Sequence, residues 1–163
     1  MNHCMDALNK GVVMPSATSK KTLFSTECAV EIDIQATPEK VWALLIDVPN
    51  LTRWNSTLIS VEGRIALGET IKLKAKTAPD RVFNLKISQM TAPRLLVWED
   101  GMAPMFKGVR TYTLTPQGNG GTRFAMREVI SGLMLPMIGG SLPDFKPSFD
   151  QYAADLKRAA EQG

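Results

Sequence analysis

The stretch Ala36–Ser56, ATPEKVWALLIDVPNLTRWNS, decides how the chain is organised because it interrupts a sequence that otherwise reads mostly as strands. It opens with TPE at 37–39, an N-cap residue followed by proline in the first helical turn and an early acid, which together mark a helix start. Pro49 ends that helix, and Asn50 is expected to cap a second turn that runs through Trp54. The apolar stripe of the first helix consists of Val41, Trp42, Leu44, Leu45 and Val48. The stretch therefore predicts two short helices in quick succession.

Strand patterns lie on both sides of these helices. Residues 28–36, CAVEIDIQA, alternate apolar and polar side chains, which indicates a half-buried first strand. From residue 57 to 131 the chain reads as six further strands, most of them separated by the turn sequences TAPD, TAPR, DGMAP and QGNGG. Their predicted limits are 57–63, 69–77, 81–90, 94–100, 106–115 and 122–131.

The end of the chain, residues 142–162, predicts a long amphipathic helix. Within LPDFKPSFDQYAADLKRAAEQ, apolar residues recur at spacings of 4, 3, 4 and 3, which places them on one helical face. Pro147 falls in or near the first turn, where proline is tolerated. The apolar face consists of Phe145, Phe149, Tyr152, Leu156 and Ala159.

The predicted hairpins can be registered against one another, and matching apolar residues support each register. A turn centred on Asn119 pairs Leu114 with Phe124, Tyr112 with Met126, and Arg110 with Glu128. A turn at TAPD pairs Ala75 with Phe83, Leu73 with Leu85, and Ile71 with Ile87. Across DGMAP, Trp98 is expected opposite Gly108, and Glu99 opposite Lys107. One face of the sheet then carries Ile71, Leu73, Phe83, Leu85, Ile87, Leu96, Trp98, Tyr112, Leu114, Phe124, Met126 and Ile130.

This apolar face needs a cover, and the C-terminal helix is the one predicted helix long enough to provide it. The result is an α+β domain in which a curved antiparallel sheet of about seven strands wraps around a long C-terminal helix. The length of 163 residues fits one domain, which we place at residues 22–163. Residues 1–21 are expected to form a flexible N-terminal tail, or a tail that folds over a neighbouring chain.

Three stretches carry a family resemblance: IDIQATPEKVWALLIDVPNLTRWN, GGTRFAMREVISGLM and FDQYAADLKRAAE. With the order of elements, they resemble the SRPBCC superfamily, also called START-like or helix-grip, and most closely its polyketide cyclase/dehydrase branch. The similarity spans about residues 23–161. It implies a strongly bent sheet around the long helix, with a cavity for an apolar or amphipathic small molecule. It also implies that the two short helices close one end of the grip. The large apolar area of Trp42 favours a place in the core over a ligand contact.

Composition and missing motifs exclude several other classes. A net charge of +3 does not suggest nucleic-acid binding, and no apolar run reaches the ~18 residues of a membrane span, so no membrane insertion is expected. Cys4 and Cys28 form neither a CxxC nor a Cys/His cluster, which fits a reducing, cytoplasmic location without a secretory signal. The lone histidine is His3, in the predicted tail, so we expect no metal site and no cofactor. Cys28 lies on the apolar face of the first strand, so it is predicted to be a small buried hydrophobic residue.

Glu128 is the sharpest candidate for chemistry. It shares the inward face with Phe124 and Met126, and a carboxylate there must be paired or have its pKa raised. With Arg110 opposite, it is either a structural ion pair or a polar grip on a ligand. Tyr112 is either a hydrogen-bond donor or an ordinary core residue, and Asp100 has inward parity but is read as a turn residue beside Gly101.

The predicted ligand-binding set combines this pair with the apolar face. Trp54 is equally a lining residue or a packing residue, and Met134 belongs to a segment, residues 131–143, that forms either a mobile gate or a rigid connection. The full set is Trp54, Leu73, Phe83, Leu85, Ile87, Trp98, Arg110, Tyr112, Phe124, Met126, Glu128, Met134, Phe149 and Tyr152.

Two functions follow from these residues. The favoured one is a binding or carrier module for a lipid, polyketide-like or isoprenoid compound. The alternative is a polyketide cyclase or dehydratase, with Glu128 as acid or base, Arg110 steadying an oxyanion, and Tyr112 as a further candidate. Protein binding through the outer face of the sheet is less favoured because that face carries many lysines.

Overall fold

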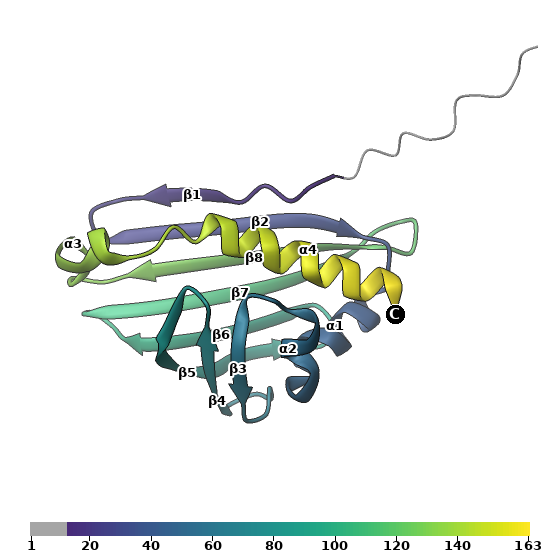
Figure 1. The fold of residues 1–163 in the computed structure, drawn as a ribbon, viewed down its shortest axis with the longest axis horizontal. Coiled ribbons are helices and arrows are strands. Elements are labelled where there is room, and N and C mark those ends of the chain that lie inside the picture. The colour runs from purple at the N-terminus through teal and green to yellow at the C-terminus, as the bar shows by residue number, and fades with distance from the viewer. Residues whose placement is uncertain (1–12) are drawn as a thin grey trace, which may run out of the picture.

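A computed structural model describes residues 13–163, and its main feature is one curved antiparallel sheet of eight strands in the order β1-β2-β8-β7-β6-β5-β4-β3. The long helix α4 lies across the inner side of this sheet, against β2 (Figure 1). The strands are β1 Thr18–Lys21, β2 Ser25–Ile34, β3 Leu58–Glu62, β4 Thr70–Ala75, β5 Ala78–Thr91, β6 Leu95–Met102, β7 Phe106–Pro116 and β8 Thr122–Ser131. The helices are α1 Pro38–Ile46, η1 Val48–Asn50, α2 Leu51–Trp54, α3 Leu135–Ile138, η2 Gly139–Ser141 and α4 Lys146–Gln162. The α+β prediction of a sheet wrapped around the last helix is confirmed.

The two short helices after the first long strand are confirmed as well. The Thr37 side chain accepts a hydrogen bond from the Lys40 backbone N at 3.3 Å, so Thr37 is the N-cap of α1. Asn50 precedes α2 as predicted, but its side chain donates to Asp47 Oδ2 at 2.7 Å and does not cap the helix. Helices α1 and α2 close the end of the sheet near the C-terminus (Figure 1). Trp42 is buried there, as expected.

Of the three predicted hairpin registers, the one around Asn119 is confirmed, and the ones at TAPD and DGMAP are wrong by two residues. In the β7–β8 hairpin, Arg110 faces Glu128, Tyr112 faces Met126 and Leu114 faces Phe124. In the β4–β5 hairpin a bulge after Leu73 tightens the turn, so Leu73 faces Phe83 and Ile71 faces Leu85. In the β6–β7 hairpin Trp98 faces Arg110 and Asp100 faces Gly108, while Glu99 and Lys107 still form an ion pair of 3.4 Å. A slip of two residues keeps every side chain on its predicted face, because strand side chains alternate with a period of two.

The eighth strand, β1, lies inside the segment that was predicted to be a tail. Its four residues pair with residues 26–29 of β2, and the Ala17 backbone N donates to Asp150 Oδ1 of α4 at 2.6 Å. Ordered structure therefore begins before residue 22. The sequence TSKK gave no strand signal because all four of its side chains are exposed and none alternates with a buried one. Residues 1–12 of the predicted tail lie outside the described residues.

The core lies between the inner face of the sheet and α4. Phe149, Tyr152 and Leu156 of α4 are almost fully buried, as their spacing predicts. Cys28 of β2 is buried as well, and burial raises the pKa of its thiol to about 11, so it stays protonated near neutral pH. None of the helices described is long and apolar enough to cross a membrane.

Candidate functional site

A cavity of about 280 Å³ lies between the inner face of the sheet and the segment that leads into α4. Strands β3 to β8 supply one wall, and residues 141–148 supply the other. Most of the lining is apolar, so water gains few hydrogen bonds there. The apolar lining residues are Leu58, Leu73, Ala75, Ala78, Phe83, Leu85, Trp98, Phe106, Ile130, Leu142, Pro143 and Phe145.

Arg110 and Glu128 form an ion pair on the cavity wall. The β7–β8 register sets them side by side, and the Arg110 Nε donates to Glu128 Oε2 at 3.0 Å while Nη2 donates to the same oxygen. In residues 13–163 no donor is hydrogen-bonded to the other oxygen, Oε1. The two side chains are 21% and 20% exposed, so the pair faces the cavity without being sealed in protein. Burial by itself lowers the pKa of Arg110, but the Glu128 carboxylate and the nearby Tyr112 together raise it overall, so Arg110 remains a cation.

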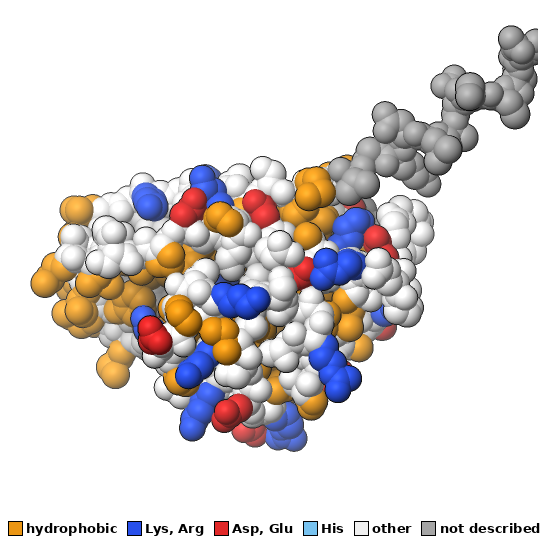
Figure 2. Space-filling model, in the orientation of Figure 1, with side chains coloured by type: hydrophobic (Ala, Val, Ile, Leu, Met, Phe, Trp, Pro, Cys, Tyr) orange, Lys and Arg blue, Asp and Glu red, His pale blue; other side chains and the backbone are white. Residues whose placement is uncertain are grey.

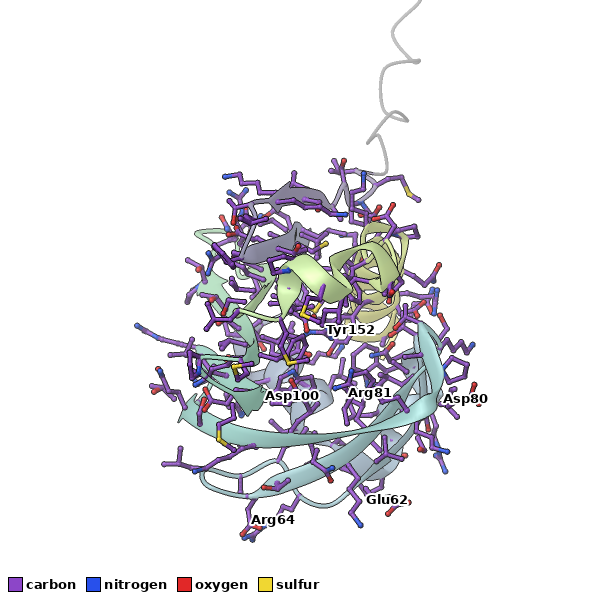
Figure 3. The ribbon with its side chains drawn as sticks, turned by 90° about the vertical axis from the view of Figure 1, so that its left-hand side faces the viewer. Glu62, Arg64, Asp80, Arg81, Asp100 and Tyr152 are labelled. Carbon is purple, nitrogen blue, oxygen red and sulfur yellow. The ribbon has the colours of Figure 1, made fainter. Side chains whose placement is uncertain are left out.

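A second pair, Arg81 and Asp100, lies on the same wall. Arg81 Nη2 is 3.6 Å from Asp100 Oδ2, and Figure 3 shows both side chains in the space between the sheet and the helices, whereas Arg64 lies outside. Burial raises the pKa of Asp100, and the charge of Glu128 raises it further against the opposing effect of Arg81. The lining of the cavity therefore includes two arginines, Arg81 and Arg110, and three acidic residues, of which Glu99 is paired with Lys107.

The interpretation of Asp100 as a turn residue is wrong. Strand β6 continues through Asp100 to Met102, so the inward parity of Asp100 decides where its side chain points. Its partner across the sheet is Gly108, and a Cβ at that glycine would lie 3.0 Å from Asp100 Oδ1. The missing side chain of Gly108 therefore leaves the space that the Asp100 carboxylate occupies.

Arg81 was missed by sequence reasoning, although its signal was present. It has the same parity in β5 as Phe83 and Leu85, which were both assigned to the inner face. Its guanidinium carbon lies 4.5 Å from the centre of the Phe83 ring, so the charged group is held over an aromatic face at the rim of the cavity. Arg110 makes a similar contact, 5.1 Å from the centre of the Phe149 ring.

Of the fourteen predicted ligand-binding residues, six line the cavity and eight do not. The lining residues are Leu73, Phe83, Leu85, Trp98, Arg110 and Glu128. Seven of the others are buried in the packed core, namely Trp54, Ile87, Tyr112, Phe124, Met126, Phe149 and Tyr152. Met134 is half-buried immediately before α3.

An aromatic cluster explains this division, because its rings pack against one another in the core. The ring centre of Tyr152 lies 5.6 Å from that of Trp54, 5.8 Å from that of Tyr112 and 6.2 Å from that of Phe124. The Tyr112 hydroxyl and the Trp54 indole N–H are buried without a hydrogen-bond partner among the described residues. Burial raises the pKa of Tyr112, which keeps its phenol neutral. The rings of this cluster therefore pack against one another and do not line the cavity.

Comparison with known proteins agrees with this architecture. The chain has a curved antiparallel sheet, a long C-terminal helix and an internal cavity, which define an α+β protein of the helix-grip, START-like class. Residues 25–161 match the family model described as "Polyketide cyclase / dehydrase and lipid transport". The chain therefore belongs to this family, within the SRPBCC superfamily. A search of curated proteins finds no match.

Solved structures from several bacteria share the fold. A START superfamily protein from Mycobacterium smegmatis superposes with a TM-score of 0.62 at 14% identity, covering 83% of this chain and 97% of that one. A conserved protein of unknown function from Enterococcus faecalis gives a TM-score of 0.63 at 16% identity, covering 89% and 77%. A protein from Mesorhizobium loti gives 0.60 at 22% identity, covering 83% and 97%. At these identities the similarity establishes the fold alone.

Proposed function

We propose that the protein binds a small apolar or amphipathic molecule in the cavity, with the apolar part against the aromatic and aliphatic walls and a polar group at Glu128. One observation carries this proposal: a cavity of about 280 Å³ whose lining is mostly apolar but includes the half-satisfied Arg110–Glu128 pair. Apolar pockets with a few convergent polar groups are typical small-molecule sites.

The size of the cavity narrows the class of ligand. Pockets for drug-sized ligands run from about 300 to 1,000 Å³, so a volume of about 280 Å³ lies just below that range. This favours one compact polyketide-like or isoprenoid molecule, or a single chain of a lipid, over a complete two-chain lipid. The free Glu128 Oε1 accepts hydrogen bonds, so the ligand's polar group is expected to be a donor such as a hydroxyl.

Extraction of the purified full-length protein with organic solvent, followed by mass spectrometry, tests the proposal. An apolar molecule should be recovered in stoichiometric amount. Ala75→Phe, which fills the cavity, should abolish recovery, whereas Ala125→Phe on the outer face of β8 should not. Glu128→Gln should weaken binding at least about tenfold while leaving the fold intact, since a hydrogen-bonded polar group is worth about 1–3 kcal/mol. Unaltered recovery in Ala75→Phe would refute cavity binding.

A second candidate function, acid–base catalysis of the cyclase or dehydratase kind, is supported by Asp100. Its pKa is raised in a cavity that also holds the Arg110 cation, so a proton donor and an oxyanion partner share one wall. Turnover of an aromatic polyketide-like substrate should then depend on pH through a group that titrates above the ordinary aspartate range. Asp100→Asn should remove that titration. Loss of activity in Glu128→Gln, with activity and its pH dependence retained in Asp100→Asn, would assign the chemistry to Glu128 instead.

A further inference from the structure

Large apolar side chains gather at the end of the molecule that holds α3. Of the eleven large hydrophobic residues that are exposed within 13–163, six lie at this end, in the β1–β2 and β6–β7 connections, at the end of β6, and in the β8–α3 loop and α3. Met102 and Met137 are the most exposed of them, at 78% and 82%. Figure 2 shows the resulting patch at the left of the molecule. We call it the apolar end: Leu23, Phe24, Met102, Met105, Leu133 and Met137.

Backbone hydrogen bonds hold the three loops together, so the patch is a preformed surface. The loop after β8 donates to the other two: Gly132 N to Phe24 O at 3.1 Å, Leu133 N to Pro104 O at 2.9 Å, and Met134 N to Met105 O at 3.0 Å. Loops that are fixed to one another present their apolar side chains simultaneously, which lowers the entropy lost when a partner covers them.

The segments that form the apolar end carry lysines, and the two neighbouring glutamates, Glu27 and Glu99, are each ion-paired, with Arg127 and Lys107. Residues 19–25, 102–107 and 131–143 contain three lysines and no aspartate or glutamate. Lys20 and Lys21 are exposed on β1 next to Leu23, while Lys107 is paired with Glu99. Apolar side chains flanked by lysines complement an anionic lipid surface. A second copy of the chain would instead bring lysines toward lysines.

The apolar end also borders the cavity. Three residues next to it line the cavity: Phe106, Leu142 and Pro143. Phe106 directly follows Met105, and the other two directly follow η2. A surface that covers the apolar end would therefore lie beside the rim of the cavity.

We propose that the apolar end docks the protein on the surface of an anionic lipid bilayer. The six side chains enter the interfacial layer, and Lys20 and Lys21 face the anionic headgroups. Docking is peripheral, and it requires no occupied cavity, so it is independent of the proposed ligand. The orientation places the rim of the cavity against the bilayer.

Flotation of the full-length protein with lipid vesicles tests this proposal. Vesicles of phosphatidylcholine with about one-third phosphatidylglycerol should carry the protein, and pure phosphatidylcholine vesicles should carry much less of it. Added salt should weaken binding because it screens the lysines. Absence of flotation with the anionic vesicles at low salt would overturn the proposal.

Three exposed substitutions locate the docking surface. Met102→Asp and Met137→Asp should each weaken vesicle binding by about fivefold or more, because a charge replaces an apolar group in the interface. Leu67→Asp is the matched control: it adds the same charge at a side chain that is 65% exposed, in the loop between β3 and β4, and should bind as the unmodified protein does, apart from the small effect of one charge. Thermal unfolding checks that all three remain folded. An equal loss of vesicle binding in all three variants, or no loss of vesicle binding in any of them, would overturn the assignment of the surface.

Sedimentation equilibrium separates docking from self-association. The proposal expects a monomer in solution whose binding scales with vesicle concentration. A dimer that Met137→Asp dissociates, together with no vesicle binding, would make the apolar end a contact between copies and overturn the proposal.

Discussion

At the scale of single residues, the Arg110–Glu128 pair carries both structural and functional interpretations. Its side chains are about one-fifth exposed, and one carboxylate oxygen receives both donors. Removing one member of a largely buried pair leaves the other charge without compensation, whereas replacing both with apolar residues is often neutral. A double-mutant cycle therefore measures the structural part of its role separately from ligand binding.

We expect Glu128→Leu and Arg110→Met each to lower the free energy of unfolding by about 2–4 kcal/mol, and the double variant to lose less than either one. Urea denaturation without ligand measures the free energy of unfolding of the unmodified protein, the two single variants and the double variant. If the two single losses simply add, the side chains are not energetically coupled, and the pair has no structural role.

At the scale of elements, Asp155 ties α4 to the chain that leaves α2. Its carboxylate is fully buried and accepts from Ser56 N at 2.8 Å, Ser56 Oγ at 2.6 Å, Gln151 Nε2 at 2.8 Å and Arg158 Nη2 at 2.7 Å. Burial by itself raises the pKa of Asp155, but these donors outweigh it and lower the pKa. The contribution of Asp155 to stability is therefore present above the unfolded pKa of about 3.9 and is lost as the pH falls through the lower folded pKa.

Asp155→Asn should consequently lower the free energy of unfolding by about 2–3 kcal/mol at pH 7, because the amide turns one acceptor into a donor facing other donors. The difference from the unmodified protein should shrink as the pH is lowered from about 5 to 2. Denaturation at a series of pH values measures it. A difference that does not vary with pH would contradict the ionised state of Asp155.

The loop between β8 and α3 requires a glycine at position 132. Gly132 has φ of +141°, and a Cβ there would lie 2.2 Å from the Met105 carbonyl oxygen, a backbone atom with no freedom to rotate away. Gly132→Ala should therefore lower the free energy of unfolding by about 2–4 kcal/mol. Gly118→Ala, where nothing lies within 4 Å, is the control and should change it by less than about 0.5 kcal/mol. Thermal unfolding compares the two, and similar melting temperatures would show that the loops are not held as closely as described.

At the scale of the whole molecule, β1 is the edge strand of the sheet. It covers the outer edge of β2, whose backbone groups would otherwise be free to pair with another chain. All four of its side chains are exposed, so it adds little apolar burial. Its contribution is expected to be protection of an edge more than stability.

A chain that begins at residue 22 should accordingly unfold at nearly the same temperature, with a loss of about 1 kcal/mol, but should self-associate. A chain that begins at residue 13 keeps β1 and is the control. Size-exclusion chromatography at several concentrations distinguishes them. A monomeric chain from residue 22 would mean that the β2 edge is protected by other means.

The sequence by itself determined the local elements and the face of each side chain. The N-cap at Thr37, the apolar spacing of α4 and the alternation in β7 and β8 are properties of neighbouring residues, so the fold class and the Arg110–Glu128 pair could be predicted from them. What lines a cavity depends on how far the sheet bends away from α4, and that distance is a property of the complete packing. The tertiary structure alone therefore decided that Tyr112 and Tyr152 pack into the core, that Arg81 and Asp100 pair with each other beside the cavity, and that loops from three parts of the chain meet at the apolar end.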